Sequence, residues 1–378
     1  MFKVKDVYTL PKKEIPKTLV LIIDLSLPGG VSHYYRTLGL NELHNVTYFP
    51  INSGKTQSVV KTALRLITNY WKFFVKVIQE DFETVVVNPS LDQGKSFYRD
   101  MVFIILTRIL KRDIIVFFHG WYEPFEEKIK KSKSKSFLFK ISYAKVKRYI
   151  VLGNIFKTKL ISLGVPPTTT FFIESMVASS AYLNEVNLQE KYLSYEKEIK
   201  ILFLSRIEKE KGIYIAIDAF HSFSLKYPQR KATLVIAGDG RDLPEVKDYV
   251  RNKAIPKINF VGYVDNVEKN KVLLESHIMI FPSFTEGLPN VILEGMLYGL
   301  PIIARSAGAI SEVVIDDING FTTESYDPAI FEEYLSKLSC DFELYRLMAE
   351  ANHKVAREKF TSEKVKERVI KIYENFSD

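Results

Sequence analysis

The sequence predicts an α/β protein with two open parallel sheets, one in each half of the chain. Short β-rich runs alternate with amphipathic helical patterns along the whole length, which is typical of parallel strands joined by helices. The runs are nearly continuous in apolar residues, as expected of strands that are buried on both faces. The chain has 378 residues, and at roughly 100–200 residues per domain this length suggests two domains.

In the first half we expect four strands, at residues 18–25, 85–89, 113–120 and 148–153. Residues 58–80 have helical spacing, with basic residues mixed into the polar face. Residues 178–199 are polar and contain no strand-like run. We therefore expect the domain boundary in this segment, with a first domain of residues 1–185.

The alternation resumes in the second half, where we expect strands at residues 200–207, 232–240, 257–264, 277–283, 300–306 and 320–324. Each of these runs is followed by a plausible helix. The last pattern, at residues 360–376, is also helical. We therefore expect a second domain of residues 186–359 and a terminal segment, residues 360–378, that packs back on the first domain.

The composition is that of an ordinary globular protein, with 47% apolar and 26% charged residues. The single Cys340 excludes an intramolecular disulfide and a thiolate metal cluster, which fits a reducing cytoplasm. The first residues, MFKVKDVYTLPKKE, contain no apolar segment typical of a signal peptide. The longest apolar run, residues 101–106, is far shorter than the ~20 residues that span a bilayer. We expect a soluble protein or one that lies on a membrane surface.

The positive charge is concentrated in the first half. Residues 1–180 carry +13 and residues 181–378 carry −5, which together give the net charge of +8. Residues 128–148 contain nine Lys and Arg and no acid. This asymmetry fits an anionic membrane surface, with apolar residues beside lysines in SFLFK and NYWKFFVK, but it also fits a solvated basic face. A nucleic-acid partner is not expected, because no binding motif is present.

Two carboxylates, Glu286 and Glu294, flank the segment GLPNVIL after the strand at residues 277–283. Pro289 suits the first position of a helix, which places Glu286 and Gly287 in the loop and Glu294 about one turn into the helix. The N–H groups at such a helix start bind phosphate, and the carboxylates could accept hydrogen bonds from sugar hydroxyls. Alternatively, the two acids only stabilise the helix dipole.

Two cations and a glycine turn follow neighbouring strands. Arg206 and Lys211, after the strand at residues 200–207, could neutralise a diphosphate, or they could be solvated strand-end residues. Gly238 opens a glycine turn after the strand at residues 232–240, and a plain tight turn is an equal alternative. In open parallel sheets, ligands bind beyond the carboxyl ends of the strands.

These stretches together resemble the family-four retaining glycosyltransferases of group 1 type, which have the GT-B fold. The resemblance runs through ILFLSRIEKEKG (201–212), VIAGDG (235–240), INFVGYV (258–264) and the whole of residues 281–321. The last stretch reads glutamate, seven residues, glutamate, then G-x-P-[IV]-[IV] and G-[GA]-x-x-E, and the match covers essentially all of residues 200–325. The resemblance implies two Rossmann-like domains that face each other across a cleft.

The resemblance also implies roles for single residues. Glu294 would hold the nucleotide ribose, and Glu286 and His119 would contact the donor sugar. The other residues implied to bind the donor are Gly29, Gly30, Arg206, Lys211, Gly238, Gly287, Leu288, Pro289 and Asn290, and the implied catalytic residues are Glu286, His119, Arg206 and Lys211. The chain departs from the family at Glu174 and Ser175, where an Asn-Gly turn is usual, and at Ser205, where glycine is usual.

We expect no catalytic metal and no cofactor, because no D-x-D motif follows a strand and the histidines lack ligand spacing. The function that the resemblance implies is transfer of a sugar from a UDP- or GDP-sugar to a glycan or lipid-linked acceptor with retention of configuration. We expect front-face attack, at the cytoplasmic face of the membrane, in surface polysaccharide, lipopolysaccharide or capsule synthesis in a bacterium. The alternatives are a sugar-nucleotide hydrolase or epimerase of the same fold, and a basic binding protein without turnover.

Overall fold

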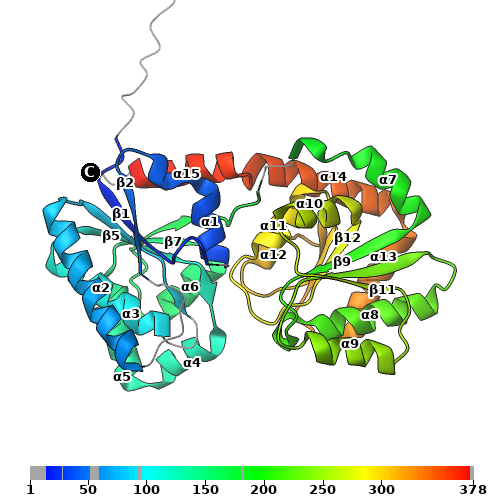
Figure 1. Ribbon diagram of the computed structural model, residues 1–378, viewed down its shortest axis with the longest axis horizontal. Coiled ribbons are helices and arrows are strands. Elements are labelled where there is room, and N and C mark those ends of the chain that lie inside the picture. Colours follow the sequence, from blue (N-terminus) through cyan, green and yellow to red (C-terminus); the bar gives the residue numbers. More distant parts are fainter. Residues whose placement is uncertain (1–13, 28, 52–58, 92–94, 180–182, 375–378) are drawn as a thin grey trace, which may run out of the picture.

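Two six-stranded parallel sheets lie side by side in the computed structural model (Figure 1), which describes residues 14–27, 29–51, 59–91, 95–179 and 183–374. The strand orders are β2-β1-β3-β5-β7-β8 and β11-β10-β9-β12-β13-β14. In both sheets, helical connections carry the chain from one parallel strand to the next. The predicted fold class is therefore confirmed at the level of architecture. Residues 1–13, 180–182 and 375–378 of the predicted domains lie outside the described residues.

The first sheet contains two strands that the sequence did not predict, β2 and β8. Both are edge strands with half-exposed side chains, so neither shows a continuous apolar run. Pro50 ends β2, a position that an edge strand tolerates because the missing N–H is not needed. The six strands are β1 (Thr18–Ile22), β2 (Val46–Pro50), β3 (Thr84–Val87), β5 (Asp113–Phe118), β7 (Arg148–Val151) and β8 (Thr170–Ile173).

The helices of the first half are α1 (Gly30–Leu38), α2 (Val59–Gln79), α3 (Lys95–Ile109), α4 (Glu123–Lys131), α5 (Lys133–Ile141) and α6 (Asn154–Ser162). Two 3-10 turns, η1 (Leu40–Glu42) and η2 (Tyr143–Lys145), and a small parallel pair, β4 (Ser90–Leu91) with β6 (Gly120–Trp121), complete this part. Along the chain, β4 follows β3 and β6 follows β5.

All six strands predicted in the second half are present, and the candidate functional residues follow β9, β10 and β12. They are β9 (Ile199–Leu204), β10 (Ala232–Ala237), β11 (Ile258–Gly262), β12 (Ile278–Phe281), β13 (Ile302–Arg305) and β14 (Gly320–Thr323). The helices are α7 (Leu188–Lys197), α8 (Ile213–Lys226), α9 (Leu243–Asn252), α10 (Asn266–Glu275), α11 (Asn290–Leu297), α12 (Ile310–Val313), α13 (Pro328–Cys340) and α14 (Phe342–Lys359), with 3-10 turns η3 (Leu183–Glu185) and η4 (Lys209–Lys211).

The last helix, α15 (Ser362–Glu374), leaves α14 and lies against α1 of the first half, as the red helix in Figure 1 shows. Its apolar side chains Val365, Val369 and Tyr373 are buried in the same core as β1. The Ala178 N–H donates to the Phe360 carbonyl at 2.8 Å, so the two crossings between the halves run beside each other.

Glu174 and Ser175 follow β8 and contact α15. The buried Glu174 carboxylate accepts from the Arg368 guanidinium (Nε to Oε2, 2.9 Å) and from the Ser175 N–H at 2.7 Å. A buried carboxylate is tolerated when it is paired and hydrogen-bonded in this way. The contact between Glu174 and Arg368 therefore attaches the last helix to the end of the first sheet.

A second link between the halves is the cap that Glu312 of α12 supplies to α6. The Glu312 carboxylate accepts the N–H of Asn154 at 2.8 Å and the N–H of Ile155 at 2.9 Å. A carboxylate at a helix N-terminus satisfies free N–H groups and interacts favourably with the dipole. A Cβ at Gly153 would lie 2.6 Å from Glu312 Oε1, so glycine is needed for this approach.

None of the helices in the described part of the chain combines the length and the apolar character that crossing a bilayer would require.

We predict that Glu312→Ala loosens the contact between the halves at α6. Losing a cap of this kind costs about 0.5–2 kcal/mol, and the amides of Asn154 and Ile155 should then exchange faster in hydrogen–deuterium exchange. Glu333→Ala, which removes a carboxylate from the exposed ion pair with Lys337 on α13, is the matched control. Unchanged exchange in residues 154–162 of Glu312→Ala would contradict the cap.

Candidate active site

A cavity of about 460 Å³ lies between the two halves, at the carboxyl ends of strands from both sheets. Loops after β1, β5, β9 and β12 all contribute to its walls, which is where open parallel sheets bind ligands. The predicted site residues that line it are Gly29, Gly30, His119, Arg206, Lys211, Glu286, Gly287, Leu288, Pro289, Asn290 and Glu294. The structure thus brings together every candidate residue except Gly238.

The loop between β12 and α11 is held by hydrogen bonds from the neighbouring strand ends. The buried Arg305 guanidinium donates from Nη1 to the carbonyls of Ser283 and Phe284, at 3.3 and 3.2 Å. The Ser283 hydroxyl in turn donates to Glu286 Oε1 at 2.6 Å. The direction of the Glu286 carboxylate is therefore set by β13 as well as by its own loop.

Two glycines allow this loop to approach the rest of the protein closely. A Cβ at Gly287 would lie 2.6 Å from the His119 carbonyl oxygen, across the boundary between the halves. Gly308 has a φ of +60°, and a Cβ there would lie 2.3 Å from the carbonyl oxygens of Glu286 and Gly287. Positive φ strains other residues, and neither site has space for a side chain.

Helix α11 begins one residue later than predicted. Pro289 is the N-cap, with a φ of −68° and a ψ of 131°, and Asn290 is the first helical residue. The extended ψ of Pro289 turns the chain from the loop into the helix, so the proline directs the entry instead of starting the helix. Glu294 lies one turn into α11, as expected.

Glu286 and Lys211 form an ion pair at the cavity wall. The Lys211 ammonium donates to Glu286 Oε1 at 2.5 Å, and both side chains are largely buried. Lys211 is the last residue of η4. The Glu210 carbonyl of this turn accepts a hydrogen bond from the Phe284 N–H at 2.9 Å. Arg206 is exposed and donates to Glu208 at 3.0 Å. Both predicted cations therefore already have carboxylate partners.

Sequence reasoning missed two residues, Lys269 and His33, that contact Glu294. The Lys269 ammonium donates to the buried Glu294 Oε1 at 2.7 Å, and His33 Nε2 lies 3.7 Å from the same oxygen. Burial lowers the pKa of His33, and the Glu294 carboxylate opposes this shift. Because His33 lies only three residues after Gly30, the sequence could have identified it as a candidate site residue. Nothing in the pattern of α10 distinguishes Lys269.

Three buried polar atoms at this end of the cavity have no hydrogen-bond partner among the described residues: His33 Nε2, Asn290 Oδ1 and Glu294 Oε2. Leaving a buried polar atom unpaired costs about 1–3 kcal/mol. Two of these atoms can only accept hydrogen bonds. The cavity is therefore suited to a ligand that donates hydrogen bonds from hydroxyl groups.

His119 is neutral and its tautomer is defined by Asn88. The Asn88 amide nitrogen donates to the Leu21 carbonyl at 2.8 Å, so its oxygen accepts from the Tyr35 hydroxyl at 2.7 Å and from His119 Nε2 at 3.0 Å. His119 Nδ1, 3.4 Å from Met176 Sδ, is then the unprotonated nitrogen. Burial lowers the pKa of His119 to about 3. His119 can accept a hydrogen bond, but it cannot act as an acid near neutral pH.

Gly238 lies behind the cavity instead of in its wall. It has a φ of +141°, and a Cβ there would lie 1.9 Å from the Ser205 carbonyl oxygen. The glycine allows the end of β10 to pack against the residue that precedes Arg206. Gly238 is not among the residues that line the cavity, and its role in donor binding stays a prediction.

A second cavity of the same volume, about 460 Å³, lies near the amino ends of β9 and β12. Its buried Lys191 donates to the carbonyls of Leu273 and Leu274 at 2.9 and 2.7 Å, and burial lowers its pKa to about 7. This lysine binds carbonyl groups in the last turn of α10, so it already has a structural role.

Among the described residues, no group of three or more His, Cys, Asp or Glu is placed to hold a metal ion.

We predict that His119 does not titrate between pH 5 and pH 8 in an NMR titration of its ring. Its native pKa lies below the unfolded value of about 6.5, so the stability that comes from the neutral ring is present above pH 6.5 and is lost as the pH falls toward 3. Between pH 7 and pH 5 the loss is about 2 kcal/mol, and it should be absent in His119→Gln. A ring midpoint above pH 5 would contradict the neutral tautomer.

The second half of the chain, residues 185–355, matches the family model described as glycosyl transferases group 1. An uncharacterized glycosyltransferase of Methanocaldococcus jannaschii is 29% identical over 177 residues, 47% of this chain and 48% of the relative. N-acetyl-alpha-D-glucosaminyl L-malate synthase of Bacillus anthracis is 29% identical over 187 residues, 49% and 48% of the two chains. The chain spans about half the length of these two relatives.

Among solved structures, HepE of Anabaena in complex with UDP and glucose is similar with a TM-score of 0.70 at 15% identity, over 96% of this chain and 100% of that one. Sucrose-phosphate synthase of Thermosynechococcus elongatus has a TM-score of 0.72 at 15% identity, over 95% and 98% of the two chains. At these identities the likeness shows the fold alone, which is GT-B. Residues 185–355 are thus similar to the glycosyl transferases of group 1, and the whole chain has the GT-B fold.

Proposed function

We propose that the protein is a retaining glycosyltransferase that moves a sugar from a UDP- or GDP-sugar to a glycan or a lipid-linked acceptor. The observation that carries the proposal is the buried Glu294, whose Oε2 has no hydrogen-bond partner among the described residues, in a cavity that also contains the Glu286–Lys211 pair. The nucleotide bound to HepE of Anabaena, UDP, and the name of the Bacillus anthracis relative support this class of donor.

Glu294 would bind the ribose of the donor through its free oxygen. Lys269 donates to the other oxygen at 2.7 Å and so orients the carboxylate. The two ribose hydroxyls supply the hydrogen-bond donors that Glu294 Oε2 and Asn290 Oδ1 lack. Ribose binding would therefore satisfy polar atoms that no described residue pairs.

The diphosphate would lie between the starts of α1 and α11. Gly29 and Gly30 leave open space at the start of α1, because a Cβ at Gly29 would meet no atom within 4 Å. The N–H groups of both helix starts favour an anion, and Arg206 and Lys211 add positive charge. The donor sugar would then reach Glu286 and the unprotonated His119 Nδ1.

We propose front-face transfer without a covalent intermediate and without a catalytic metal. The bond between the anomeric carbon and the phosphate oxygen breaks, the acceptor oxygen bonds to the same face of that carbon, and the acceptor proton passes to the departing phosphate. Glu286 and Glu294 are the two carboxylates among the described residues that line the cavity. Both are already engaged by lysines, which makes either one a poor nucleophile.

A sugar-nucleotide hydrolase or epimerase would use the same donor residues and is the alternative. The place of action that we propose is the cytoplasmic face of a membrane, in surface-glycan synthesis. The basic first half and the acceptor class both fit this location.

We predict that one nucleotide-sugar series stabilises the protein in a thermal panel of UDP-, GDP-, ADP-, CMP- and dTDP-sugars. A ligand at 100 times its Kd adds about 2.7 kcal/mol to the free energy of unfolding. Glu294→Gln, which cannot accept as strongly from a ribose diol, should lose this gain. Glu275→Gln, which alters an exposed pair with Lys200 far from the cavity, should keep it. If no series stabilises the wild type, the donor proposal fails.

A separate prediction concerns the reaction path. With donor and acceptor present, the product should have the anomeric configuration of the donor, and mass spectrometry should find no sugar attached to the enzyme after rapid quenching. An adduct on Glu286 or on another carboxylate would overturn front-face transfer, and inversion of the product would overturn retention.

A further inference from the structure

Helix α2 carries apolar side chains on two opposite sides. Phe73 and Val77 are fully buried against the first sheet. On the outer side, four apolar side chains at helical spacing are exposed: Leu64 by 60%, Ile67 by 64%, Trp71 by 66% and Ile78 by 50%. The outer face of a helix in a globular protein is normally polar, and a continuous exposed apolar stripe marks an interaction surface.

Cations lie along one flank of this stripe. At 3.6 residues per turn, Lys61, Arg65, Lys72 and Lys76 project from the same side of α2, next to the apolar row. Lys61 and Lys72 are exposed, and Lys76 pairs with Glu80. The helix therefore combines an apolar stripe that includes a tryptophan with a basic flank, as helices that lie in a membrane interface do.

Helices α3 and α5 extend this surface beyond α2. The α2 helix contacts α3, and the Arg108 guanidinium at the end of α3 donates to the Ile141 carbonyl of α5 at 2.7 Å. Ile109 and Phe137 are exposed by 65% and 61%. In Figure 1 the three helices lie together at the lower left, across the first sheet from α1 and α15. Exposed Lys133 and Lys140 share a face of α5 with Phe137.

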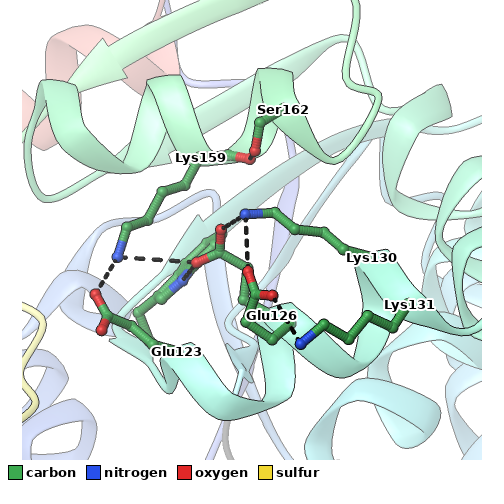
Figure 2. Close-up of polar contacts among 8 residues, drawn as sticks. Glu123, Glu126, Lys130, Lys131, Lys159 and Ser162 are labelled. Carbon is green, nitrogen blue, oxygen red and sulfur yellow. Dashed lines mark hydrogen bonds and ion pairs between the residues drawn. The ribbon is translucent and has the colours of Figure 1, made fainter.

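Lys130 and Lys131 of α4 do not belong to this surface, because neighbouring carboxylates neutralise them. Figure 2 shows Lys130 and Lys131 directed toward carboxylates of the same helix, and Lys159 of α6 between Glu123 and Glu126. The Lys159–Glu123 contact is 2.7 Å, and Lys130 lies 2.6 Å from Glu126. The basic segment at residues 128–148 is thus divided. Lys130 and Lys131 are paired with carboxylates of α4, whereas Lys133 and Lys140 of α5 are exposed beside an apolar side chain.

We propose that the outer face of α2, α3 and α5 docks on a bilayer that contains anionic phospholipids. The exposed apolar side chains would enter the headgroup region, and the lysines would meet the phosphates. A second copy of this chain fits less well, because pairing the same face would bring the basic flanks together. Nucleic acid would need the cations but not the apolar stripe. The proposal does not depend on the transfer reaction, since it concerns a surface away from the cavity.

Vesicle sedimentation without any donor tests the proposal. The wild type should bind phosphatidylglycerol-containing vesicles at least about tenfold more tightly than pure phosphatidylcholine vesicles, and high salt should weaken the binding. Each neutralised lysine, in Lys72→Gln and Lys140→Gln, should lower the partition coefficient by about fivefold. Brominated lipids should quench the exposed Trp71 but not the buried Trp121.

The decisive variant replaces Leu64, Ile67 and Trp71 by serine. These side chains are exposed, so the fold should persist, and vesicle binding should fall by more than about tenfold. The matched control replaces Leu225, Val267 and Leu347 by serine. These are exposed apolar residues of the second half, so this variant should bind vesicles as the wild type does. Equal binding by both triple variants overturns the proposal. A wild-type dimer that the first variant dissociates, with no vesicle binding, assigns the face to a second copy instead.

Discussion

The two halves of the protein meet at the cavity through a loop that has no room for a side chain at Gly287. Gly287, between β12 and α11, packs against the His119 carbonyl of the first half, and Gly308 packs beneath the same loop. Packing this close forces Glu286, Glu294 and His119 to share one cavity. The Glu312 cap on α6 follows in the same stretch of chain, so residues 286–312 shape the site and also connect the halves.

The charges in the cavity are arranged in pairs that a ligand could exchange. Lys211 binds Glu286, Lys269 binds Glu294, and Arg206 binds Glu208. Buried charges are tolerated when they are paired, and removing one partner leaves the other at high cost. An anionic ligand could interact with Arg206 and Lys211 while its hydroxyl groups donate hydrogen bonds to the carboxylates. The chemistry of a nucleotide sugar, with its diphosphate and its ribose diol, matches both requirements.

Much of the architecture could be predicted because buried parallel strands have continuous apolar runs. All six strands of the second sheet were found in this way, whereas the edge strands β2 and β8 were missed because their side chains are half exposed. The site was predicted less evenly. Motif residues such as Glu286 and Glu294 line the cavity, but Lys269 has no local signal, and Gly238 proved to support the backbone of Ser205.

The sequence by itself determined the alternation of strands and helices, the loops that carry chemistry and the glycines that those loops need, because each depends on local spacing and backbone conformation. Only the tertiary structure decided which charges meet. Lys130 and Lys159 are neutralised by carboxylates on α4, while Lys72 stays exposed beside Trp71. Likewise, His33 and Lys269 reach Glu294 from elements far apart in the chain. Such contacts depend on how helices pack across the sheets, and no local pattern records that packing.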